Sequence, residues 1–181
     1  MSAIKFRISE AFKMFCIRKA DVRQAKQLAD IHASGFILPW DQSALRAFIE
    51  DNTVLPYIAT DPTGHDIAGF ILTRHVLDEA DILTVAVTPK WQNNGIGYGL
   101  CHASMRYLLA QGVGKVHLEV NAQNHSAIKL YTKLGFKVVG KRANYYGVLR
   151  KGQREDALRM TLDMSSAFFQ FEPVAYVVDH F

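Results

Sequence analysis

The segment 82–112 constrains the fold of this chain more than any other. It begins with the apolar, β-branched run ILTVAVTP, passes through the glycine-rich stretch WQNNGIGYGL, and continues as GLCHASMRYLLAQG, a length typical of a helix. Gly112 is the expected end of that helix, because glycine readily adopts the left-handed conformation at helix C-termini. The sequence therefore predicts a strand, a tight glycine turn and a helix in direct succession.

Shorter elements flank this segment. Asp21 is placed to cap a first helix that ends near Gly35, and Asp41 or Ser43 is placed to cap a second through ALRAFIED. VLPYIATD and IAGFILTRHV predict a hairpin, and KVHLEVN, SAIKLYTKL, FKVVGKRANYY and DALRMTLDM predict a strand, a helix and two further strands. Early and late hairpins with strand-helix-strand units between them predict an α/β or α+β layered domain with a mixed sheet.

The length and the apolar content suit a single core. At 181 residues and 49% hydrophobic composition, the chain can bury one sizeable core, so we expect one domain over 1–165. The closing segment 166–181, SAFFQFEPVAYVVDHF, is aromatic and poor in charge. It could cover the core, add an edge strand or meet a partner, and core covering is favoured.

Several classes of protein are disfavoured by composition. No stretch resembles a signal peptide or a membrane span, so a cytoplasmic protein without a membrane partner is expected. The net charge of +4 is more typical of a solvated surface than of nucleic-acid binding. Cys16 and Cys101 lie far apart without neighbours at metal-ligand spacing, so neither a disulfide nor a metal site is expected. The oligomeric state is not indicated.

The glycine turn has two interpretations. In the order strand, Gln92 to Gly97, helix, the glycines lie at a helix N-terminus, where several backbone N–H groups lack intrahelical partners and the helix dipole is positive. Such a turn suits a phosphate, because glycine lets the backbone approach the ligand closely. On spacing alone, a plain turn and an anion-binding turn are equally supported.

The strand KVHLEVN has one wholly polar face. His117, Glu119 and Asn121 alternate with three apolar residues, so this face meets either water or a cleft. Because helices flank this strand on both sides in the sequence, a cleft is favoured over water. Glu119 would then be partly desolvated, which raises the pKa of a carboxyl group and makes it a better base near neutral pH.

A tyrosine lies on the apolar stripe of the following helix. In NHSAIKLYTKLGF, Asn124 or Ser126 can cap the helix, and Tyr131 points inward with a hydroxyl that needs a partner. Taken alone, it is best interpreted as a core tyrosine. A phenol with a pKa of about 10 could also protonate a departing thiolate.

Together these stretches resemble the GNAT superfamily of N-acetyltransferases, and within it the ribosomal-protein-alanine N-acetyltransferases. The resemblance runs from about Phe15 to Met164 through LPW, VLDEADILTVAV, QNNGIG, LEVNAQNHSAIKLYTKLGF, RANYY and REDALRMTL. QNNGIG satisfies the superfamily's cofactor motif Q/R-x-x-G-x-G/A. What the resemblance implies is a mixed, mostly antiparallel sheet, splayed at an acetyl-CoA site and flanked by helices.

The resemblance also assigns roles to residues. Glu119 matches the general base and Tyr131 the general acid for direct transfer of acetyl to the N-terminal amine of a protein, with a ribosomal protein beginning with alanine as the expected acceptor. Acetyl-CoA is the co-substrate and no metal is required. The residues implied in binding acetyl-CoA are Val85, Ala86, Val87, Gln92, Asn93, Asn94, Gly95, Ile96, Gly97, Tyr98 and Asn124.

The resemblance also implies that the acceptor enters between GFILPW and the segment from Tyr145 to Arg154. Phe36, Trp40, Tyr145 and Tyr146 are its candidate contacts, although core packing explains the first two equally well. Asn93 stands where relatives often carry arginine, and the hairpin GVLRKGQRE also departs from the family pattern. These departures bear on the acceptor more than on the reaction, so acetylation of a lysine side chain or a small amine is left open. Acyl-CoA binding without catalysis is a further alternative, against which the presence of Glu119 and Tyr131 argues.

Overall fold

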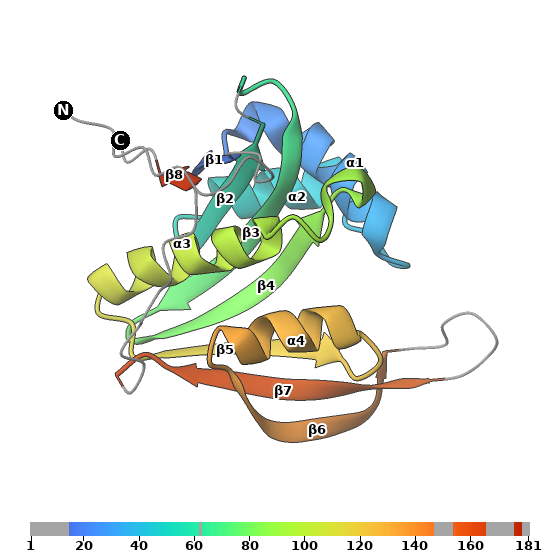
Figure 1. The fold of residues 1–181 in the computed structure, drawn as a ribbon, viewed down its shortest axis with the longest axis vertical. Helices are drawn as coiled ribbons and strands as arrows, with labels where there is room; N and C mark the ends of the chain where they lie inside the picture. The colour runs from blue at the N-terminus through green and yellow to red at the C-terminus, as the bar shows by residue number, and fades with distance from the viewer. Residues whose placement is uncertain (1–14, 62, 147–153, 166–175, 179–181) are drawn as a thin grey trace.

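The computed structural model describes residues 15–61, 63–146, 154–165 and 176–178, which form one sheet flanked by helices (Figure 1). The strand order is β6-β7-β5-β4-β3-β2-β1-β8. The strands are β1 Phe15–Lys19, β2 Val54–Thr60, β3 Ile67–Val76, β4 Glu79–Val87, β5 Lys115–Asn121, β6 Lys137–Tyr146, β7 Glu155–Asp163 and β8 Tyr176–Val178. The α-helices are α1 Ala25–Gly35, α2 Gln42–Glu50, α3 Ile96–Ala110 and α4 His125–Lys133, with short 3₁₀ helices at Val22–Gln24 and Pro89–Trp91.

The sheet opens between β4 and β5, which run parallel while most neighbouring strands run antiparallel. Their pairing extends only from Glu79 with Lys115 to Asp81 with His117. Beyond this point the two strands diverge, as Figure 1 shows. The expected mixed, mostly antiparallel and splayed sheet is therefore confirmed.

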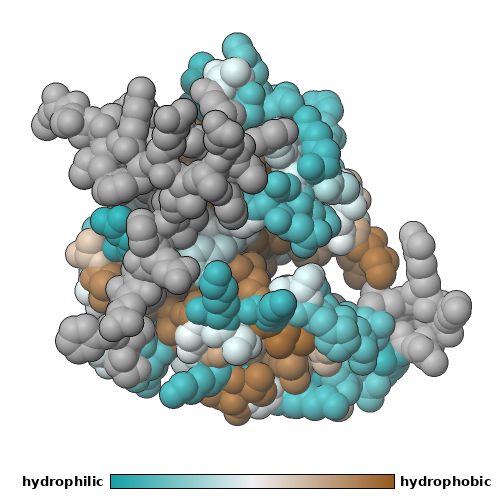
Figure 2. All heavy atoms as spheres, viewed as in Figure 1, coloured by the Kyte–Doolittle hydropathy of each residue, from teal (hydrophilic) through white to brown (hydrophobic). Residues whose placement is uncertain are grey.

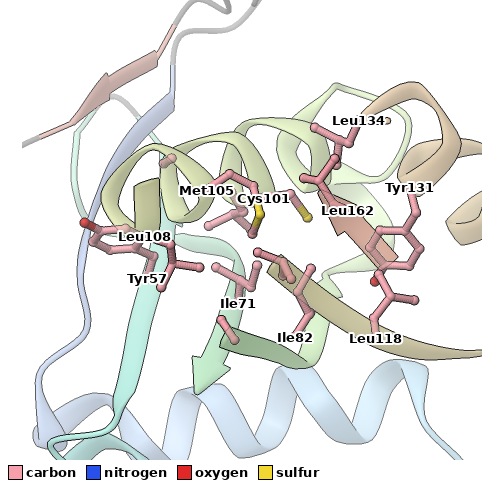
Figure 3. Packing of buried hydrophobic residues seen from close by; sticks show 14 of the residues in the cluster. Tyr57, Ile71, Ile82, Cys101, Met105, Leu108, Leu118, Tyr131, Leu134 and Leu162 are labelled. Atoms are coloured by element: carbon pink, nitrogen blue, oxygen red, sulfur yellow. The ribbon is translucent and has the colours of Figure 1, made fainter. Parts of the chain in front are cut away.

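The two faces of the sheet carry separate cores. On one face, α3 and α4 cover a large apolar cluster, and on the other face α1 and α2 cover a smaller one. Cys101 and Met105 point from α3 towards the strands, and Tyr131 points from α4 towards Leu118 of β5 (Figure 3). Both cores anchor β4, so the strand that borders the opening is held from two sides.

A bulge in β4 changes which layer its side chains face. The register with β3 shifts so that Leu83 is the extra residue. Before the bulge, Ile82 belongs to the core beneath α3, whereas beyond it Ala86 belongs to the core beneath α1 and α2. Val85 and Val87 then pack on the α3 side. The bulge thus re-aims the part of β4 that borders the opening.

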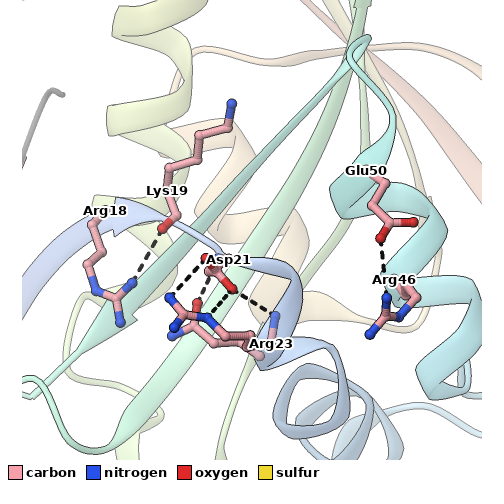
Figure 4. A network of polar contacts seen from close by, with 7 residues as sticks. Arg18, Lys19, Asp21, Arg23, Arg46 and Glu50 are labelled. Carbon is pink, nitrogen blue, oxygen red and sulfur yellow. Dashed lines mark hydrogen bonds and ion pairs between the residues drawn. The ribbon is translucent and has the colours of Figure 1, made fainter.

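The expected helix caps are present. Asp21 accepts a hydrogen bond from the backbone of Arg23 (Figure 4). It also forms a capping box with Gln24 at the 3₁₀ turn before α1. Helix α1 ends at Gly35, and the Asp41 side chain caps α2. Helix α3 begins at Ile96, earlier than the stretch GLCHASMRYLLAQG suggested, because Gly95 takes the left-handed N-cap position with φ of 77°.

Two strands at one end of the sheet, β1 and the edge strand β8, were not predicted outright. Strand β1 carries charged residues in a short run, and it forms by pairing with β2. The described part of the closing segment, Tyr176–Val178, pairs parallel with β1, one of the three roles that the sequence left open. The rest of that segment lies outside the described residues. Within the described residues, no helix is both long enough and apolar enough to cross a membrane.

Candidate functional site

A groove of about 1680 Å³ occupies the opening between β4 and β5 and reaches both faces of the sheet. The space-filling view shows a hollow in the surface between the part of the molecule that contains β4 and the part that contains β5 (Figure 2). The groove brings together residues predicted from distant segments, namely Phe36, Trp40, Val85, Ala86, Val87, Gln92, Asn93, Gly95, Ile96, Gly97, Tyr98, Glu119, Asn124, Tyr131 and Tyr145. Asn94 does not line it, and the side chain of Tyr146 and residues 147–153 lie outside the described structure.

The glycine turn is shaped by its own amide side chains. Asn93 and Gly95 are both left-handed, with φ of 62° and 77°. Gln92 donates through Nε2 to the carbonyl of Val87 at 3.1 Å, and Asn94 donates through Nδ2 to the carbonyl of Gln92 at 2.8 Å. No side chain caps α3, so its first N–H groups face the groove end without intrahelical partners. Gln92 and Asn94 therefore brace a loop that leaves backbone N–H groups at the end of the groove.

The helix that follows the turn lies close to β4 and α4. A Cβ atom at Gly97 would meet Leu130 Cδ2 at 3.3 Å and Val87 Cγ2 at 3.9 Å. Across the groove, Asn124 caps α4, accepting hydrogen bonds from the Ser126 hydroxyl at 2.9 Å and the Ala127 amide at 3.1 Å. The absence of a side chain at Gly97 therefore lets α3 lie close to α4 and β4 where it lines the groove.

The polar face of β5 borders the groove, as the cleft interpretation expected. His117, Glu119 and Asn121 are each partly exposed and line it, while the residues between them are buried. His117 Nδ1 lies 2.9 Å from the Thr161 hydroxyl, and its Nε2 lies 3.8 Å from Glu79 Oε2. Glu79 of β4 is therefore part of the same wall.

The expectation that Glu119 has a raised pKa is wrong. Burial does raise the pKa of this carboxyl, but hydrogen bonds from Arg142 and Tyr145 and the charges of Arg142 and Arg159 outweigh it and hold the pKa below its usual value. Arg142 Nη1 lies 2.7 Å from Glu119 Oε1. Sequence reasoning missed this cation because it lies on β6, two strands away from β5.

Tyr131 lies on the opposite side of β5 from these cations. It is buried, with 7% of its surface exposed, yet it lines the groove. Its ring packs edge-on against Phe136 at 5.7 Å. The two cysteines do not line the groove, and burial raises the pKa of the Cys101 thiol to about 12. Of these three side chains, only that of Tyr131 therefore lines the groove.

The loop between α1 and α2 is organised by a histidine that was not predicted as part of the site. The His32 ring stacks between Phe36 at 4.0 Å and Trp40 at 4.9 Å, with 4° between the planes in both pairs. Burial lowers the pKa of His32 to about 4. Phe36 is 40% exposed and Leu38 79% exposed, so the loop presents apolar surface beside the groove. The place of His32 on the apolar stripe of the first helix was the only signal in the sequence.

On the other side of the groove, β6 contributes Arg142 and Tyr145. The Arg142 guanidinium lies 4.2 Å from the centre of the Tyr145 ring, and Tyr145 hydrogen-bonds to Glu119. The two walls expected to hold the acceptor therefore face the same opening. Among the described residues, no three His, Cys, Asp or Glu side chains gather as they would around a metal ion.

A sheet that splays around a groove, with a glycine turn and a helix N-terminus at its end, defines the N-acetyltransferase class of fold. The sequence pattern of the acetyltransferase (GNAT) family matches residues 25–136, and this chain belongs to that family.

Similar proteins carry a more specific name. The [ribosomal protein bS18]-alanine N-acetyltransferase of Escherichia coli is 41% identical over 99 residues, which cover 55% of this chain and 66%, just under two thirds, of that protein. The enzyme of the same name from Haemophilus ducreyi is 33% identical over 137 residues, covering 75% of this chain and 91% of that protein. The crystal structure of the Escherichia coli ribosomal-protein-S18-alanine N-acetyltransferase superposes with a TM-score of 0.77 at 31% identity, covering 88% of this chain and 100% of that one.

Proposed function

We propose that this chain transfers the acetyl group of acetyl-CoA to the N-terminal α-amino group of a protein, with a ribosomal protein that begins with alanine as the acceptor. The observation that carries the proposal is the groove between β4 and β5, which joins the glycine turn to Glu119 through the sheet. The names of the similar proteins support the choice of acceptor. A cytoplasmic location fits an enzyme that acts on ribosomal proteins.

The residues on one side of the groove fit acetyl-CoA. Beyond Asp81, β4 pairs with β3 alone, so its free edge at Val85, Ala86 and Val87 can hydrogen-bond to the amide groups of the pantetheine arm. Backbone N–H groups between Asn93 and Tyr98 would hold the pyrophosphate, as helix N-termini hold anions in general. Bound there, acetyl-CoA supplies an activated thioester.

The residues on the other side fit an amine. An α-amino group has a pKa of about 7.7–8.0, so much of it is protonated at neutral pH and cannot attack. Glu119, directly or through a water, would take one proton from the ammonium. The nitrogen then attacks the acetyl carbon, a backbone N–H of β4 stabilises the developing oxyanion, and the C–N bond forms as the C–S bond breaks.

Tyr131 completes the balance of protons. Its hydroxyl would protonate the departing thiolate. The nitrogen loses a second proton after it attacks, and a proton returns through solvent to Tyr131 in place of the one that it donated. The products are the acetylated amine, CoA thiol and one proton released from Glu119. No covalent intermediate with the protein is needed, consistent with the position of both cysteines away from the groove.

The test is acetylation of synthetic peptides that begin with alanine, followed by release of free CoA thiol and by mass-spectrometric location of the acetyl group. The matched control is the same peptide with a blocked N-terminus and an internal lysine. We expect turnover only with the free N-terminus, and a loss of about 10²-fold or more in kcat for Glu119→Gln and Tyr131→Phe.

The alternatives give different outcomes in the same assay. Acetylation of the blocked peptide, or of a polyamine in preference to the peptide, would assign the acceptor to a side-chain or small-molecule amine. Binding of acetyl-CoA without turnover on any amine would instead indicate an acyl-CoA-binding protein. Full activity of Glu119→Gln would show that another group takes the proton.

A further inference from the structure

Arg142 already provides a cation at the place where the proposed base would meet its substrate. Its Nη1 lies 2.7 Å from Glu119 Oε1, a distance typical of a charge-assisted hydrogen bond. The pairing of β6 with β7 and of β7 with β5 lets Arg142 reach across β7 to Glu119. Without an acceptor, the carboxylate is therefore held ionised by a guanidinium.

The contact is of a kind that is easily exchanged. The Arg142 side chain is 52% exposed and that of Glu119 27% exposed, and ion pairs at such exposure contribute little to the stability of a fold. The guanidinium also has a second support, because it stacks 4.2 Å from the centre of the Tyr145 ring. Arg142 can therefore leave Glu119 and remain ordered against Tyr145.

We propose that Arg142 is a positioning residue whose guanidinium stands in for the acceptor's ammonium, and that the two cations exchange on Glu119 each time a peptide binds. The proposal rests on the proposed role of Glu119 as the base. If Arg142 left without a replacement, Glu119 would be an unpaired carboxylate in a partly buried site, which is costly. A one-for-one exchange of cations avoids that cost. It also selects for an acceptor that arrives as a cation.

The exchange turns Glu119 from a poor base into a better one. While Arg142 is bound, its hydrogen bond and charge help to hold the pKa of Glu119 low, far below that of an amine. Once the guanidinium is displaced, the cation in its place is the ammonium, which becomes neutral as it gives up its proton. The effect of burial, which raises the pKa of Glu119, then meets weaker opposition, so the carboxyl accepts that proton more readily. When the neutral amide product leaves, the return of Arg142 lowers the pKa again and releases that proton to solvent.

Other charged and titratable groups line this side of the groove, and the proposed exchange requires no movement of them. They are Glu79 and Asp81 on β4, His117 on β5, Arg159 on β7 and Tyr145 on β6. Arg159 acts on Glu119 through its charge alone, whereas Arg142 donates a hydrogen bond to it. Arg142 is therefore the group whose removal isolates the exchange.

The experiment compares pH profiles of kcat/KM and kcat for an alanine-initiated peptide at saturating acetyl-CoA. The kcat/KM profile reports the free enzyme, with Arg142 on Glu119, and the kcat profile reports the complex, in which the exchange has occurred. For Arg142→Gln we expect the acidic limb of kcat/KM to move up by about one pH unit, a loss of about tenfold on that limb. The acidic limb of kcat should not move.

Two further variants separate the exchange from a structural effect. Arg142→Lys keeps a cation and should restore the wild-type limb of kcat/KM. Lys141→Gln removes the neighbouring cation of β6, which pairs with Asp156 at 2.6 Å and does not line the groove, and it should leave both profiles unchanged. An unmoved limb in Arg142→Gln, an equal shift in both profiles, or the same shift in Lys141→Gln would overturn the proposal. Retained turnover in Glu119→Gln would instead refute the proposed base, whatever the Arg142 variants do.

Discussion

His32 accepts a hydrogen bond from the backbone N–H of Trp40, with 3.0 Å between Nδ1 and the amide nitrogen. The neutral imidazole therefore carries its proton on Nε2. The same ring stacks on Phe36 and on the Trp40 indole. One side chain thus supplies a flat surface and a hydrogen-bond acceptor, which together fix the loop that borders the proposed acceptor site.

Two substitutions divide these contributions. His32→Phe keeps the flat ring without the acceptor atom, and His32→Asn keeps an acceptor without the ring. For each we expect the KM for an alanine-initiated peptide to rise by about tenfold, with the KM for acetyl-CoA unchanged, because the loop borders only the acceptor side. Steady-state kinetics with each substrate varied in turn would measure this. His65→Phe, on an exposed turn outside the groove, is the control.

Stability should fall in mild acid because two histidines are buried in the neutral form. Burial lowers the pKa of His32 to about 4, and burial together with the charge of Arg106 lowers that of His102 to about 4. The unfolded chain binds these protons near pH 6.5, so the stabilisation is complete above that value and is lost as the pH falls towards 4. We expect the free energy of unfolding to drop by about 2 kcal/mol per histidine between pH 7 and pH 5.

Urea unfolding at the two pH values tests this expectation. His32→Phe should remove about half of the pH dependence, whereas His65→Phe should leave it as in the wild type. Equal stability of the wild type at pH 7 and pH 5 would contradict the burial of two neutral histidines.

Gly69 holds β3 against the strand that borders the groove. A Cβ atom there would lie 2.6 Å from the carbonyl oxygen of Ala86 and 3.1 Å from Val87 Cα, both backbone atoms that cannot turn aside. Gly69→Ala should therefore destabilise the fold by about 1–3 kcal/mol and weaken acetyl-CoA binding, because β4 must shift. In Gly140→Ala the nearest contact is the Arg159 Cδ atom at 3.9 Å, so thermal unfolding of this control should be close to wild type.

Gly97 should affect the co-substrate more than the fold. A larger side chain there would enter the narrow space between Leu130 and Val87. For Gly97→Val we expect the KM for acetyl-CoA to rise by about tenfold or more, with the KM for the peptide unchanged, because the proposed site for the co-substrate, and not that for the peptide, includes Gly97. Calorimetric titration with acetyl-CoA would measure the loss of affinity directly. Wild-type affinity would place the co-substrate elsewhere.

Local features of this protein could be predicted from its sequence. The Asp21 and Asp41 caps, the end of α1 at Gly35 and the alternating faces of β5 all depend on residues within a few positions of one another. Helices and strands have fixed periods, so such patterns are readable without the fold. The glycine turn and the polar face of β5 were therefore recognised as candidate parts of a site.

The tertiary structure alone decided how these parts act on one another. The bulge at Leu83 changes the direction in which the side chains of β4 point, and His32 orders the loop between α1 and α2. Arg142 reaches Glu119 across an intervening strand. The last of these reversed the expected sign of the pKa shift of Glu119. The periodicity of β5 showed that this carboxyl faces a cleft, but a pKa depends on every charge within a few ångströms. Which charges those are is set by strand order, not by position along the chain.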